Sequence, residues 1–398
     1  MSSEQNMPGY LDTERRYERR QTLKRCRRYG LFLFAFVLGV GCLLLWKGEI
    51  GQGIDRWVLQ QFFSLRGKLT PPEDIIIVGR DQGMLEKYGL PLPRAVIADG
   101  LEKIVQGDLK LLIVDASLPQ DGAEPEADKR IARAFASVPT VIGAGKFYTD
   151  EGEALTFGSD SIFQEAASFE IPMTFPGDQG VVSRIAIDRS KEASLYQRVP
   201  LAQALPPGSI AADMTPPGQF DLINFYGPAG TVRHISLQDL IDGDLEYAKE
   251  QLKDRIVLVG GNFGEKSSKI ENSDEFFISA SPDTMYGVEI HATIVGNILE
   301  QSWIRQLDSI HTVAIFYCCV VFIFLLIFFL HPFLAYMLIG LMLVLLTVLN
   351  YLLFSWQLVW SGGLGTVWLV AILSIILTGI YKRYCLKGVQ RYLKERFN

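Results

Sequence analysis

A stretch of 73 residues without a charged side chain, Ser309–Tyr381, constrains this chain more than any other feature. It is long enough for three helices of about 20 residues, the length that crosses a hydrocarbon core of about 30 Å. Breaks fall at His331-Pro332 and between Ser355 and Gly365, where tryptophans and glycines cluster. Proline interrupts helices and tryptophan favours the membrane–water interface, so the pattern predicts transmembrane helices at residues 311–330, 333–354 and 362–381.

A further apolar segment lies near the N-terminus. Tyr29–Trp46 follows four clustered basic residues, and its 18 residues are about the shortest length that spans a membrane. A cleaved signal peptide is the alternative, but the leader of 28 residues is long and charged, and no small-residue cleavage site follows. We therefore expect an uncleaved first transmembrane helix at residues 29–46.

The basic residues predict the orientation. Residues 1–28 carry eight Lys/Arg against four Asp/Glu, and residues 382–398 carry six against one. Basic flanks stay in the cytoplasm, so both termini are expected inside the cell, which requires an even number of spans. One helix before and three after residues 47–308 satisfy this rule. The sequence thus predicts a multi-pass protein of the bacterial inner membrane with an extracytoplasmic, periplasmic segment at 47–308.

This exterior segment carries no cysteine, because all five cysteines lie in or beside the predicted spans. Disulfide scaffolds and zinc clusters are therefore excluded, and a segment of this size can fold without them. The residues between the two basic flanks carry 24 basic and 39 acidic side chains. This acidity argues against nucleic acid as a partner.

Short β-branched runs alternate with helical patterns in the exterior segment, which favours β-α-β pairing. Strands are expected at residues 74–79, 109–116, 140–144, 220–226 and 255–260, and helices at 93–106, 127–137 and 287–301. The predicted fold class is an α/β sensor domain with a mixed, largely parallel sheet, combined with four transmembrane helices.

Short motifs in collinear order across about residues 50–305 carry a resemblance to a known family. The first are Asp55-Arg56, Leu65-Arg66-Gly67, a strand ending near Asp81, Gly89-Leu-Pro-Leu-Pro-Arg94, Val114-Asp115 and Asp128. The others are Gly180-Val-Val-Ser-Arg184, Asn224-Phe-Tyr-Gly-Pro228, Ile256-Val-Leu-Val-Gly260, Asp274-Glu-Phe-Phe277 and Tyr286-Gly-Val-Glu-Ile-His-Ala292. Three apolar segments follow. In combination, the chain resembles the CHASE type-2 extracellular sensory domain.

The resemblance implies an extracytoplasmic sensor region of a signalling protein, of the kind joined to a cytoplasmic nucleotide cyclase, histidine kinase or Ser/Thr kinase. The chain departs from the family pattern in two places. Leu90 and Leu92 stand where aromatic residues are usual, and Gly79-Arg80-Asp81-Gln82 stands where Ile-Asp-Asp is common. Both lie near a predicted strand end, so the family's ligand preference carries over poorly.

Ligands of open parallel sheets bind beyond the carboxyl ends of the strands. Asp81 and Asp115 each follow an apolar strand, so their carboxylates could share one crevice. Gly260-Gly261-Asn262 follows a third strand and could let a ligand approach the backbone closely. Arg94 opens a helix and could meet an anion. The alternative is that the aspartates cap helices or close loops, which is their commoner use, and that Arg94 pairs with Asp81 or Asp115 inside the fold.

Metal and cofactor sites are not expected. Glu289 and His291 are two residues apart on a helix, so they project about 200° apart and cannot easily chelate one ion; His291 is interpreted as a packing or capping residue. Gly260–Gly264 lacks the Lys-Ser/Thr of a phosphate-binding loop, and no hydrolase or metalloprotease motif occurs. The chain is therefore not expected to be an enzyme.

The resulting hypothesis is a membrane sensor that detects an extracytoplasmic small-molecule or protein signal and transmits it to a separate cytoplasmic partner. A cyclase or kinase and a second copy of the chain are the candidate protein partners, beside the lipid bilayer. Only 17 residues follow Tyr381, and they form a basic amphipathic tail, which is too short for an enzyme domain. The alternatives are a four-helix transport or channel subunit and a remnant sensor without output.

Overall fold

The computed structural model describes residues 48–89, 91–119, 124–148, 154–172, 181–183, 221–261 and 275–380, together with Gln21, Arg391 and Glu395. The chain divides into two compact units. The helical unit comprises the residues up to Val58, Leu307–Leu353 and the residues from Trp360 onward. The α/β unit comprises Leu59–Gln306 and Phe354–Val359. The predicted first span and most of the predicted tail lie outside the described residues.

Within the described residues, seven strands form the main sheet of the α/β unit, in the order β4-β3-β2-β8-β1-β7, with β5 also paired to β3. All pairs are parallel except that of β3 with β4. The strands are β1 (Ile75–Arg80), β2 (Leu111–Val114), β3 (Thr140–Tyr148), β4 (Ala154–Phe157), β5 (Phe169–Pro172), β7 (His234–Ser236) and β8 (Ile256–Gly261). The central strands are short apolar runs because both of their faces are covered.

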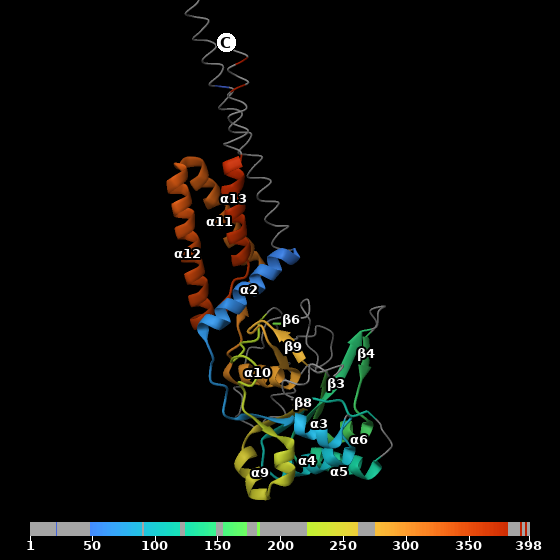
Figure 1. Ribbon diagram of the computed structural model, residues 1–398. Helices are drawn as coiled ribbons and strands as arrows, with labels where there is room; N and C mark the ends of the chain where they lie inside the picture. Colours follow the sequence, from blue (N-terminus) through green and yellow to red (C-terminus); the bar gives the residue numbers. More distant parts are fainter. Residues whose placement is uncertain are drawn as a thin grey trace, which may run out of the picture. The chain divides into compact units, whose positions relative to one another are not determined.

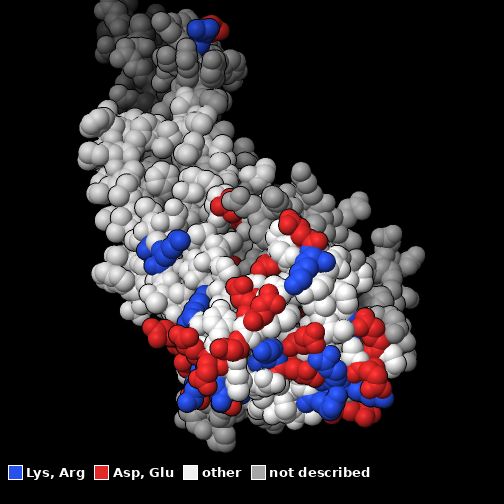
Figure 2. All heavy atoms as spheres, turned by 60° about the horizontal axis from the view of Figure 1, so that its bottom comes forward, with Lys and Arg blue, Asp and Glu red and all other residues white. Residues whose placement is uncertain are grey.

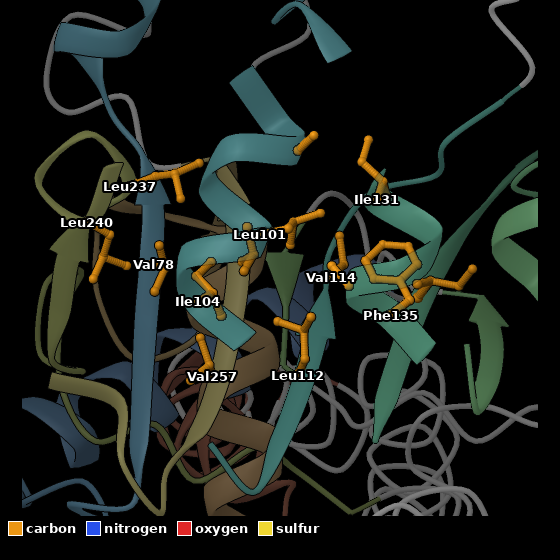
Figure 3. Close-up of a cluster of buried hydrophobic side chains, with 14 of the residues drawn as sticks. Val78, Leu101, Ile104, Leu112, Val114, Ile131, Phe135, Leu237, Leu240 and Val257 are labelled. Carbon is orange, nitrogen blue, oxygen red and sulfur yellow. The ribbon is translucent and has the colours of Figure 1, made fainter. Parts of the chain in front are cut away.

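One face of this sheet carries a large hydrophobic cluster. Alternate residues of the strands, including Val78, Leu112, Val114 and Val257, pack against Leu101, Ile104, Ile131, Phe135, Leu237 and Leu240 of the covering helices (Figure 3). These helices are α4 (Arg94–Val105), α5 (Pro125–Ser137), α6 (Ser161–Ala166), α8 (Leu237–Asp242) and α9 (Leu245–Leu252), with α3 (Gln82–Tyr88) beside them. The helices follow the strands in sequence, as the alternating pattern predicted.

Helix α10 (Gly287–Glu300) packs against β1 and β8 from the opposite face of the sheet (Figure 1). A small second sheet joins β6 (Val181–Val182), β9 (Glu275–Ile278) and β10 (Thr284–Tyr286), and β10 leads directly into α10. Residues 287–298 are all buried, so this helix is a core element. The three-layer arrangement confirms the predicted α/β fold with a largely parallel sheet.

The strand predicted at residues 220–226 is wrong. Leu222 makes a single isolated bridge with Ile304, and the following residues form no ladder. The side chain of Asn297 takes the place of a strand partner: the Asn224 amide donates to its Oδ1 at 2.8 Å, and its Nδ2 donates to the Asn224 carbonyl at 3.1 Å. Because one side chain satisfies both backbone groups of Asn224, the segment stays irregular although it is buried.

The helical unit contains α11 (Ser309–Phe329), α12 (Pro332–Gln357) and α13 (Leu364–Ile380). Of the described helices, α11 and α12 are long and apolar enough to cross a membrane, and α13 has a shorter apolar stretch. The breaks fall where the sequence predicted them, at Pro332 and in a connection where Gly362 and Gly363 have φ of +65° and +70°. Charged side chains gather over the α/β unit, whereas α11–α13 present none (Figure 2).

We expect residues 48–305 to fold on their own. They hold the main sheet of the described residues with helices on both of its faces, and they contain no cysteine. The isolated segment should therefore melt cooperatively, at the same temperature with and without reductant, when followed by circular dichroism. A molten or insoluble product would show that the segment depends on the membrane helices or on a second copy.

Candidate functional site

Three neighbouring central strands end side by side at the carboxyl edge of the main sheet. Arg80 ends β1 and is in register with Gly261 at the end of β8. Val114 ends β2 opposite Val259, and the next residue, Asp115, donates its amide to the Val259 carbonyl at 2.8 Å. The strand order thus brings Arg80, Asp115 and Gly260-Gly261 to the region where open parallel sheets bind ligands.

Asp115 and His291 form a buried polar pair at this edge. His291, from α10, is 1% exposed, and its Nε2 lies 3.7 Å from Asp115 Oδ1; the Asp115 side chain is 10% exposed. The other carboxylate oxygen, Oδ2, is buried without a hydrogen-bond partner among the described residues. A buried oxygen in this state costs free energy, which makes it the clearest candidate for a contact that a ligand completes.

The burial of Asp115 and the nearby charge of Arg80 determine its protonation. Burial raises its pKa from 3.8 to about 6, and the positive charge of Arg80 partly opposes that rise. The folded domain therefore holds the proton more tightly than the unfolded chain. The stabilisation this gives is fully present below about pH 4 and is lost as pH rises through 6.

An Asp115→Asn variant tests this. It keeps the shape of the side chain and removes the charge, so it should match the wild type near pH 4 and exceed its stability at pH 7 by at most about 3 kcal/mol. The measurement is urea unfolding of residues 48–305 at a series of pH values. A difference that stays constant from pH 4 to pH 7 would contradict the assignment.

Asp81 and Arg94 do not join Asp115. The Asp81 side chain caps α3 by accepting from the Met84 amide at 3.0 Å, the alternative role that the sequence left open. Arg94 is 7% exposed and faces Asp128 at 3.7 Å instead of Asp81 or Asp115. Its Nη2 also donates to the Pro119 carbonyl at 2.7 Å, and the start of its helix is occupied by the carboxylate of Glu124. Both residues therefore have contacts within the fold.

Gly260 has a packing role as well. A Cβ added there would lie 2.5 Å from the Cβ of Val288, so the glycine lets α10 approach the sheet closely. Gly261 is the last residue of β8, opposite Arg80. Asn262 lies outside the described residues. Of the predicted ligand-binding candidates, the structure thus brings Asp115, Gly260 and Gly261 to one edge, where Arg80 and His291 join them.

Glu289, the neighbour of His291, serves a different purpose. Its carboxylate accepts the backbone amides of Gly230, Thr231 and Val232 at 2.8, 2.9 and 3.1 Å and so fixes the loop before β7. Burial raises its pKa, and these amides oppose the rise. Glu289 and His291 thus contact different groups, as their spacing predicted. Among the described residues, no group of three or more His, Cys, Asp or Glu side chains could hold a metal ion.

Sequence reasoning also missed a polar network on the same helix. Arg66 donates to the Asn224 side chain and, at 2.5 Å, to the Phe225 carbonyl. Tyr226 donates to Glu300 at 2.8 Å and packs so closely on Gly296 that an added Cβ would lie 2.5 Å from its hydroxyl. The Leu65-Arg66-Gly67 and Asn224–Pro228 motifs are therefore structural: they join α2 (Glu49–Arg66) to α10.

The comparisons with known proteins agree with this architecture. A family model described as CHASE2 domain matches residues 33–330, about three quarters of the chain. The match covers Leu59–Gln306 of the α/β unit and ends one residue after α11. No curated protein and no solved structure gives a match.

Proposed function

Because this chain belongs to the CHASE2 domain family, a family of extracellular-type sensory domains, we propose that it is a membrane sensor with a separate output. In this proposal the α/β unit lies outside the cell and detects a signal, and the apolar helices carry the result to a cytoplasmic cyclase or kinase. The observation that carries the proposal is the family match itself, since it spans Leu59–Gln306 of the α/β unit together with α11. The length of α11 and α12 and the basic flanks support membrane insertion with both termini inside.

We place the signal at the carboxyl edge of the main sheet. Asp115 offers a buried oxygen that has no hydrogen-bond partner within the part of the chain that the structure describes, His291 lies 3.7 Å from its other oxygen, and the positive charge of Arg80 acts on the carboxylate. A small polar ligand that carries an amine or hydroxyl group would donate to Asp115 and relieve the cost of that oxygen.

A thermal-shift screen of polar metabolites on residues 48–305 tests the site. A ligand that binds the folded domain raises its melting temperature with concentration. We expect this shift to disappear in Asp115→Asn and to persist in Asp81→Asn, which alters only a helix cap. A ligand that shifts both variants like the wild type binds elsewhere, and the proposed site is then wrong.

Crosslinking from the C-terminal tail, residues 382–398, tests whether the chain contacts a cytoplasmic partner. Photocrosslinkers at Tyr392 or Phe397 in intact membranes should label a cytoplasmic protein or a second copy of the chain. A tail that labels lipid alone is a membrane anchor, and the proposed route to a partner then fails.

Transport is the second candidate, and the helical unit does not favour it. Asn350 of α12 donates to Ser361, and Thr312 of α11 donates to the Ser361 carbonyl at 2.8 Å. These polar groups are used to hold the α12–α13 connection. The cavity that they line has a volume of about 40 Å³, which leaves room for water but not for a substrate.

A further inference from the structure

Helix α2 carries an exposed apolar stripe. Ile50, Trp57 and Leu65 are 65%, 60% and 70% exposed. At 100° per residue, their spacings of seven and eight place them on one side of the helix. Leu59, Phe62 and Phe63 on other sides are buried. Three large apolar side chains in one exposed row indicate that something apolar covers this side.

Asp55, on the same helix, fixes α2 to the first turn of α13. Its carboxylate accepts the Gly363 amide at 2.6 Å and the Gly365 amide at 3.0 Å. Unpaired amides and the positive end of the dipole make a helix N-terminus a favourable place for a carboxylate. Gly365 lets the two helices touch, because an added Cβ would lie 2.3 Å from Ile54 Cγ2.

The first turn of α13 marks one boundary of the apolar helices. Helix α12 ends at Gln357 and α13 begins at Leu364, so their connection lies where both helices leave the hydrocarbon. Trp356, at the end of α12, is 75% exposed, as expected for a side chain at the membrane–water interface. Since Asp55 bonds directly to this connection, the part of α2 around Asp55 lies at the same depth.

We propose that the first part of α2, up to Val58, is an interfacial helix, whose Ile50 and Trp57 side chains enter the lipid of the leaflet at which α12 joins α13. The occupant of this part of the stripe is thus lipid, because it is continuous in depth with the apolar surface of the spanning helices. The predicted first span ends at Trp46, three residues before α2 begins, which brings the chain out of the membrane at this level. The proposal rests on the proposed membrane insertion of α11–α13.

Tryptophan fluorescence of the full-length protein in phosphatidylcholine vesicles tests the proposal. The fluorescence of Trp57, called the Trp57 component, is the difference between the emission of the wild type and that of Trp57→Phe. One quencher is lipid brominated near the headgroup end of its acyl chains, and the other is acrylamide in the water. We expect brominated lipid to quench the Trp57 component and acrylamide to leave it almost unchanged.

The matched control is Trp356→Phe, another exposed tryptophan at the same boundary. If the fluorescence that brominated lipid quenches is smaller in Trp356→Phe than in the wild type, Trp356 lies in the lipid. This result shows membrane insertion independently of α2. If the Trp356 component is lipid-quenched and the Trp57 component is quenched by acrylamide alone, insertion stands and the interfacial helix is wrong. A Trp57 component that neither quencher reaches would mean that protein covers the stripe, which also overturns the proposal.

Discussion

Replacing Glu289 with alanine should destabilise the α/β domain by about 3–5 kcal/mol. One buried carboxylate accepts three backbone amides, and each charge-assisted bond contributes about 1.5–3 kcal/mol. The cost of burying the carboxylate, which also raises its pKa, offsets part of their sum. Alanine would leave the amides of Gly230, Thr231 and Val232 without this acceptor. The loop before β7 would then lose its anchor on α10. Urea unfolding of residues 48–305 at pH 7 measures the change.

Two variants sharpen this test. Glu289→Gln keeps one acceptor oxygen, and in the wild type Oε1 alone accepts two of the three amides. The stability of Glu289→Gln should therefore lie between that of the wild type and that of Glu289→Ala. Glu126→Ala removes an exposed carboxylate whose partner is Lys129 on the same helix, and it should leave the midpoint unchanged. Equal effects of Glu289→Ala and Glu126→Ala would refute the anchoring role of Glu289.

Replacing Gly260 with valine should destabilise the domain by about 3 kcal/mol, the upper end of the usual cost of overpacking a well-filled core. The first added carbon would already lie 2.5 Å from the Cβ of Val288, and both β8 and the start of α10 are buried. The sheet and α10 would have to separate. The melting temperature of residues 48–305 should fall sharply, and the protein should express poorly.

The control is Gly83→Ala on exposed helix α3, where the nearest atom to an added Cβ is 3.4 Å away. This change should be neutral or slightly stabilising, since alanine favours helix more than glycine does. The double variant Gly260→Val, Val288→Gly exchanges the two side chains at nearly constant volume and should recover part of the loss. A Gly260→Val protein as stable as Gly83→Ala would falsify the close contact.

The strands of the main sheet were predictable where burial alone decides the structure. Runs such as Ile75–Val78 and Ile256–Val259 are apolar on both faces. This pattern is typical of a parallel strand that is covered on both faces of the sheet. The segment at 221–226 is also buried but is held by the side chain of Asn297, more than 70 residues away in sequence. A local pattern cannot reveal such a partner.

The candidate site was predictable only in part for the same reason. Strand ends indicated Asp115 and Gly260-Gly261, because residues after parallel strands share one edge. His291 lies next to Asp115 because α10 packs across the sheet. Neither the spacing of His291 from Glu289 nor the residues around it in the sequence indicate this contact. Asp55 belonged to a recognised motif, yet its role depends on Gly363 and Gly365, about 310 residues later.

The central claim is that the sensory domain lies outside the membrane, whereas both chain termini lie in the cytoplasm. Reporter fusions test this claim most directly. Alkaline phosphatase, which is active only after export, should be active when fused after residue 300, at the end of α10. It should be inactive when fused after Asn398, because the basic tail is expected in the cytoplasm. The reverse pattern, or activity at both positions, would contradict the account.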